Sequence, residues 1–150
     1  MKKTFIFIIV SLFTLMISCN QTSKTETKSA TTDSTKTSAN QKLQIYYFHL
    51  TNRCVTCNSI EANVKSLLET NFKKEMESGE ISFQSINIEE KENYEIAEKY
   101  QTANASLFLT RVVKGSEKTI DLTTEAFSYS KNEADKFKSI VKDSVNVLIK

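Results

Sequence analysis

The sequence predicts an α/β domain over residues 42–150, in which four strands form one mixed sheet with helices on both faces. Two observations predict this class. Short runs rich in β-branched and aromatic residues alternate with longer runs in which apolar residues recur every three or four positions. The two glycines of the chain, Gly79 and Gly115, stand where a helix and a strand are expected to end. The predicted order is therefore β-α-β-α-β-β-α.

The first half of the domain contains three predicted elements. Residues 43–50 (LQIYYFHL) favour a strand because they are rich in aromatic and β-branched residues. Residues 55–78 form a long amphipathic helix that ends at Gly79, a common residue just past a helix. Residues 81–88 (ISFQSINI) form the second strand, with an irregularity where the alternation of apolar residues shifts at positions 84–85.

The second half contains a short helix, a hairpin and a final helix. Residues 89–100 predict a charged helix, and residues 106–113 (SLFLTRVV) predict the third strand. A turn at 114–117 leads into a fourth strand at 118–122, and the last helix covers 132–149. Since a helix separates the first three strands from one another, we expect those strands to be parallel, with an antiparallel edge added by the hairpin.

The N-terminal residues have the pattern of an export signal. Lys2 and Lys3 precede an apolar stretch over 5–17, which is shorter than the roughly 20 residues of a membrane-spanning helix. A serine and then Cys19 follow, which resembles the lipobox of bacterial lipoproteins; an ordinary signal peptide with a nearby cysteine is the alternative. We therefore expect a signal peptide over 1–18, a lipidated Cys19, and anchorage in the bacterial cell envelope facing the periplasm or the exterior.

Residues 19–41 should connect this anchor to the domain as a disordered linker. Eleven of the 22 residues from 20 to 41 are Ser or Thr, and only two are apolar, so the segment cannot bury enough surface to order itself. The domain after it carries 15 Lys and Arg against 16 Asp and Glu. Such a near-neutral balance gives no basic surface of the kind that binds nucleic acid. We also expect the domain to be monomeric and to bind no cofactor.

Cys54 and Cys57 stand at the junction between the first predicted strand and the first predicted helix. A lone CxxC is a weak signal, but in this position, and with the β-β-α ending, the domain resembles the thioredoxin fold in its minimal, glutaredoxin-like form. The resemblance implies thiol–disulfide exchange with an exported protein client and a redox donor. Cys54 would attack the client, favoured by the helix N-terminus and by Arg53, and Cys57 would resolve the mixed disulfide.

The resemblance also implies which residues meet the client. Val55 and Thr56 occupy the two positions between the cysteines, which tune the redox balance. The extended segment Asn104, Ala105 and Ser106 leads into the third strand and would face the cysteine pair.

Two positions depart from the family pattern. Phe48 stands six residues before Cys54, where thioredoxins have a buried acid, and Ala105 stands where they have a cis-proline; this chain has no proline. His49 should point to the opposite face of the strand from Phe48. Both replacements point away from efficient general-purpose disulfide reduction. They leave two alternatives: a slower or specialised redox role, or a relative that keeps the fold for another use.

Two other functions fit the same cysteines. Cys54, Cys57 and His49 together are three soft ligands, which suits Cu(I) better than a four-ligand zinc site. Alternatively, the pair is a permanent disulfide in a binding domain of an exported protein. For single residues the sequence favours ordinary structural roles, with Tyr46 and Tyr47 filling core and interface, and residues 89–92 forming a solvated helix start.

Overall fold

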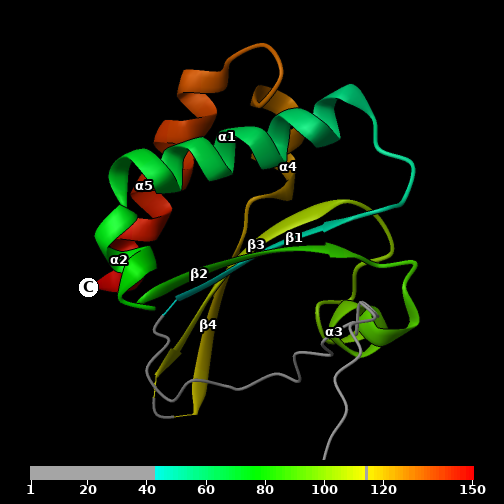
Figure 1. Ribbon diagram of the computed structural model, residues 1–150, viewed down its shortest axis with the longest axis horizontal. Coiled ribbons are helices and arrows are strands. Elements are labelled where there is room, and N and C mark those ends of the chain that lie inside the picture. Colours follow the sequence, from blue (N-terminus) through cyan, green and yellow to red (C-terminus); the bar gives the residue numbers. More distant parts are fainter. Residues whose placement is uncertain (1–42, 114) are drawn as a thin grey trace, which may run out of the picture. The chain divides into compact units, whose positions relative to one another are not determined.

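The computed structural model describes residues 43–113 and 115–150 (Figure 1). The predicted signal peptide, Cys19 and the linker lie outside the described residues. The four strands form one sheet in the order β2-β1-β3-β4. They are β1 (Leu43–His49), β2 (Ile81–Asn87), β3 (Ser106–Val113) and β4 (Ser116–Asp121). The mixed four-stranded sheet predicted from the sequence is confirmed, and the architecture is consistent with a thioredoxin-like fold.

The strand directions correct one prediction. β1 and β2 are parallel, as expected, but β3 is antiparallel to β1, and β4 is antiparallel to β3. The helical part of the connection between β2 and β3 is short, since α3 (Tyr94–Lys99) has six residues. Such a helix is about 9 Å long, whereas a seven-residue strand spans about 23 Å. The chain therefore re-enters the sheet at the end where β2 finishes. From there β3 runs in the opposite direction to β1 and β2.

Helices cover both faces of the sheet, as predicted. In Figure 1, α1 (Val55–Asn71), α4 (Thr123–Tyr129) and α5 (Ala134–Ile149) lie above the sheet, and α3 lies below it near the ends of β1 and β2. The short α2 (Lys73–Glu77) continues from α1, and a 3₁₀ turn (Lys91–Asn93) precedes α3. Within the described residues, no helix is long and apolar enough to cross a membrane.

Two predicted helices differ from the structure, and one helix was missed. The helix predicted over 55–78 is divided at Phe72, which leaves helical geometry with a φ of −133° and buries its side chain in the core. The helix predicted over 89–100 begins as the 3₁₀ turn and becomes α-helical only at Tyr94. Helix α4 was not predicted, because TTEAFSY has few apolar residues. Gly79 does end the preceding helix and has a φ of +74°, which only glycine adopts without strain.

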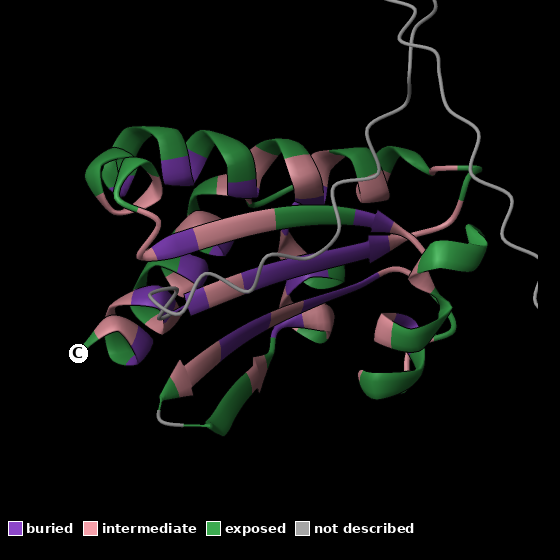
Figure 2. Ribbon diagram, turned by 60° about the horizontal axis from the view of Figure 1, so that its bottom comes forward, coloured by how far each residue is buried: buried purple, intermediate pink, exposed green. Residues whose placement is uncertain are grey.

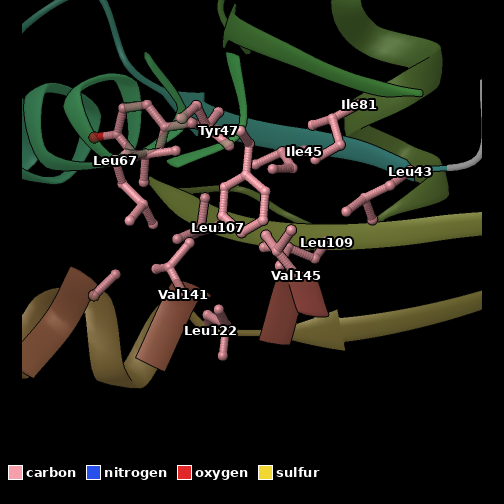
Figure 3. Packing of buried hydrophobic residues seen from close by; sticks show 14 of the residues in the cluster. Leu43, Ile45, Tyr47, Leu67, Ile81, Leu107, Leu109, Leu122, Val141 and Val145 are labelled. Atoms are coloured by element: carbon pink, nitrogen blue, oxygen red, sulfur yellow. The ribbon is translucent and has the colours of Figure 1, made fainter. Parts of the chain in front are cut away.

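The larger hydrophobic core lies between the sheet and α1, α4 and α5 (Figure 3). Alternate residues of β1, namely Leu43, Ile45 and Tyr47, face this core and are fully buried. Tyr46 and Phe48 of β1 face the other side, where they pack with Ile86, with Ile96 of α3 and with Tyr100, which follows α3. Figure 2 shows β1 buried over most of its length and β4 mainly exposed. The strand that leads to the cysteine pair is thus held firmly on both faces.

Candidate active site

The cysteine pair lies where the loop after β1 enters α1. Cys54 is the N-cap residue of α1: its backbone is extended (φ −76°, ψ 166°), and its sulfur accepts the backbone N–H of Cys57 at 3.1 Å. No acidic side chain occupies the first turn of α1. Because it caps the N-terminus of α1, the sulfur lies at the positive end of the helix dipole, where a negative charge is stabilised. This is the helix start that the sequence predicted.

Cys54 and Cys57 form a disulfide, with their Cα atoms 5.1 Å apart. Cys54 is exposed and Cys57 is half-buried, so a reagent meets Cys54 more readily. Of the two residues between them, Val55 has 68% of its surface exposed and Thr56 is half-buried. An accessible sulfur at a helix N-terminus, bonded to a second sulfur one turn further in, fits thiol–disulfide chemistry in general.

Tyr47 is a site residue that the sequence analysis missed. It was expected to fill the core, and it does, since its exposed fraction is 0%. Its hydroxyl, however, reaches the first turn of α1 and donates a hydrogen bond to the carbonyl oxygen of Cys57 at 2.9 Å. Alternation along β1 separates Tyr47 from Phe48, but it does not say which of the two faces α1 covers, so the sequence carried no signal that singles out Tyr47.

Arg53 has partners that the sequence did not predict. Its guanidinium forms an ion pair with Glu61 and lies over the Tyr47 ring, with Cζ 5.4 Å from the ring centroid. Glu61 also pairs with Lys65 at 2.7 Å. Burial opposes the charge of Arg53, but its polar interactions with Glu61 and Tyr47 outweigh burial and raise the Arg53 pKa. Part of the Arg53 charge is thus compensated by Glu61, and its proposed effect on Cys54 stays a prediction.

The loop before Cys54 is fixed from the neighbouring strand. The backbone N–H of Thr51 donates to the Glu89 carboxylate at 2.7 Å, and the Asn87 amide donates to the Thr51 hydroxyl at 3.0 Å. Hydrogen bonding from Thr51 to the Glu89 carboxylate lowers the Glu89 pKa. Glu89 was expected to belong to a solvated helix start. It is exposed as expected, but it lies before the 3₁₀ turn and accepts a hydrogen bond from the loop.

The segment 104–106 lies at the same end of the sheet as the C-terminal end of β1. Ser106 pairs with Phe48 in the antiparallel register, and its hydroxyl lies 2.5 Å from that of Thr102. Asn104 is exposed, Ala105 is half-buried and Ser106 is buried. The role of these residues in client binding stays a prediction.

Phe48 and His49 are neighbours in β1, and their side chains point to opposite faces of the sheet. Phe48, which stands six residues before Cys54, is fully buried on the α3 side, away from α1, with its ring 5.4 Å from that of Tyr100. His49 shares the other side with Tyr47, and their rings are 5.9 Å apart. The residue that reaches the main chain of Cys57 is therefore Tyr47.

A metal site built from three side chains is not formed in the described part of the chain. Among residues 43–113 and 115–150, no group of three or more His, Cys, Asp or Glu side chains is placed to hold a metal ion. His49 has its Nδ1 3.0 Å from the carbonyl oxygen of Leu50. The version of the copper hypothesis that uses His49 as a third ligand thus lacks a preformed site.

Comparison with known proteins gives few matches. No protein-family model matches the chain, and no curated protein matches it. Among solved structures, the chain is similar to one described as a malarial protein, with 14% identity, coverage of 59% of this chain and 94% of that chain, and a TM-score of 0.38. It is also similar to the thioredoxin of Fasciola hepatica, with 24% identity, 54% and 69% coverage, and a TM-score of 0.37. These likenesses are weak, so the fold assignment rests on the sheet order and strand directions above.

Proposed function

We propose that this chain is a membrane-anchored thiol–disulfide exchange protein that acts on exported protein clients through Cys54 and Cys57. The observation that carries the proposal is the position of Cys54. Cys54 is exposed, and its sulfur caps α1, accepts a backbone N–H, and is bonded to Cys57 in the first turn. A structural disulfide does not need an exposed sulfur at a helix N-terminus, whereas a nucleophilic thiolate benefits from both features.

The proposed exchange proceeds in two steps. The Cys54 thiolate attacks one sulfur of a client disulfide, forms a mixed disulfide, and releases the other client sulfur as a thiolate. The Cys57 thiolate then attacks the Cys54 sulfur, so the Cys54–Cys57 bond forms and the client leaves as a thiolate. The client gains two electrons and the dithiol loses two. A redox donor of the envelope restores the dithiol, and the same steps in reverse oxidise a client.

The membrane anchor and the location belong to this proposal. They rest on the signal-like residues 1–18 and on Cys19 in its lipobox-like context. Metabolic labelling with a radioactive fatty acid tests this part alone. We expect label on the wild-type protein and none on Cys19→Ser; equal labelling of both would exclude lipidation at Cys19.

A redox titration tests the chemistry. The full chain is equilibrated in glutathione or dithiothreitol buffers and its free thiols are counted at each potential. A reversible couple with a potential between about −270 and −120 mV, the range of disulfide oxidoreductases, is expected. A pair that stays oxidised below about −300 mV would instead indicate a structural disulfide. Stoichiometric, tight Cu(I) uptake by the reduced chain, abolished by removing either cysteine, would favour the copper hypothesis.

A further inference from the structure

We infer that Tyr47 is a positioning residue for the second step of the exchange. Its hydroxyl holds the main chain of Cys57, so that the Cys57 thiol stays within reach of Cys54 while the disulfide is open. This inference rests on the proposed function and adds a residue that the cysteine pattern does not reveal.

The support that Tyr47 offers is rigid. It lies in β1, which pairs with β2 on one side and with β3 on the other, and its side chain is fully buried in the larger core. The hydrogen bond from its hydroxyl to the Cys57 carbonyl, at 2.9 Å, joins this strand directly to the first turn of α1. The first turn of a helix is otherwise the part that frays most easily.

The surroundings of the Tyr47 ring connect both flanks of the cysteine pair. Arg53, which immediately precedes Cys54, lies over the ring and is paired with Glu61, one turn after Cys57. The residue before the first cysteine and the turn after the second are thus held around one aromatic side chain. Burial, the largest influence, raises the Tyr47 pKa above its usual value. The hydroxyl therefore remains protonated and able to donate at neutral pH.

The second step depends on where Cys57 lies. Its thiolate attacks the Cys54 sulfur, the Cys54–client bond breaks, and the electron pair leaves on the client sulfur. In the disulfide form the Cys54–Cys57 bond itself restrains Cys57, whereas in the dithiol and mixed-disulfide forms Tyr47 supplies the restraint. Removing the hydroxyl should thus lower the effective concentration of the Cys57 thiol at Cys54 and favour the open forms.

The test compares the full chain with Tyr47→Phe and with the matched control Tyr46→Phe. Tyr46 is the neighbouring tyrosine, buried on the opposite face of the sheet beside Tyr100. For Tyr47→Phe we expect the equilibrium constant for disulfide formation to fall about two- to tenfold, which raises the reduction potential by about 10–30 mV for this two-electron couple. Tyr46→Phe should keep the wild-type potential.

A kinetic measurement separates positioning from general loosening. Alkylation of reduced Cys54 by iodoacetamide should proceed at the wild-type rate in Tyr47→Phe, whereas release of glutathione from a preformed Cys54–glutathione mixed disulfide should slow by a similar two- to tenfold factor. Both measurements are made well below the melting temperature of each variant.

Three outcomes would overturn the inference. The first is a Tyr47→Phe potential within about 5 mV of wild type. The second is equal release of glutathione by Tyr47→Phe and wild type. The third is the same slowing in Tyr46→Phe. If wild type itself shows no reversible couple, the proposed function fails and the inference with it. If wild type cycles and Tyr47→Phe cycles in the same way, the inference fails and the proposed function stands.

Discussion

The sulfur of Cys54 stabilises the fold in two ways, as the N-cap of α1 and as one half of the disulfide, and replacing Cys54 separates the two contributions. As the N-cap of α1, the sulfur accepts the Cys57 N–H at 3.1 Å. A serine at this position keeps an acceptor there, whereas an alanine leaves the N–H without one. Replacing a capping side chain by alanine costs about 0.5–2 kcal/mol. Under reducing conditions we therefore expect Cys54→Ala to be about 1 kcal/mol less stable than Cys54→Ser.

Under oxidising conditions both variants also lose the disulfide. The closed loop holds only four residues, since Cys54 and Cys57 are three apart in sequence. The chain-entropy relation gives about 2 kcal/mol for a loop of that size. The oxidised wild type should therefore exceed Cys54→Ser by about 2 kcal/mol and Cys54→Ala by about 3 kcal/mol.

Urea unfolding of the full chain, followed by far-ultraviolet circular dichroism with and without reductant, measures these differences. A difference of about 1 kcal/mol should move the midpoint by about 0.3–1 M urea. Cys57→Ser and Cys57→Ala form the control pair: Cys57 is not the N-cap, so these two should differ much less. If Cys54→Ser and Cys54→Ala unfold at the same urea concentration under reducing conditions, the sulfur does not cap α1, and the reason for expecting a stabilised thiolate at Cys54 is lost.

Three further predictions follow from the site and its surroundings. Cys57→Ser should accumulate mixed disulfides with clients through Cys54, and Cys54→Ser should not; mass spectrometry of non-reduced adducts checks this, and equal trapping by both would reverse the assigned roles. Phe48→Asp should lower the free energy of unfolding by at least about 3–5 kcal/mol, because it replaces a fully buried ring with a carboxyl group on the face away from α1. It should not accelerate exchange, and faster insulin reduction by any folded fraction would contradict that placement. For Glu61, burial opposes ionisation, but its two basic partners prevail and lower its pKa below the ordinary 4.5. Its contribution to stability is thus complete above pH 4.5 and is lost as pH falls through the lower folded-state pKa, so Glu61→Gln should flatten the acid side of the stability profile, as measured by urea unfolding between pH 6 and pH 3.

Local sequence signals accounted for the parts of the site that depend on neighbours in the chain. The apolar spacing predicted a helix that begins beside Cys54, and Cys54 is its N-cap. The glycine at position 79 marked the end of the helical segment, and the run 106–113 was predicted with the bounds that β3 has. These features need only a few consecutive residues, because periodicity, capping and turn geometry are local properties.

The sequence by itself therefore determined that two cysteines stand at a strand–helix junction in an α/β domain. Contacts between distant residues decided the rest. The direction of β3 depends on where a short connection returns the chain, and the pairing of Arg53 with Glu61 depends on how the loop folds back over β1. Counting back from Cys54 drew attention to Phe48, the position of the buried acid in thioredoxins, but the packing of β1 against α1 brings Tyr47 to the main chain of Cys57. Adjacent strand residues face opposite sides of the sheet, and only the packing of helices on those sides determines which of the two meets the cysteines.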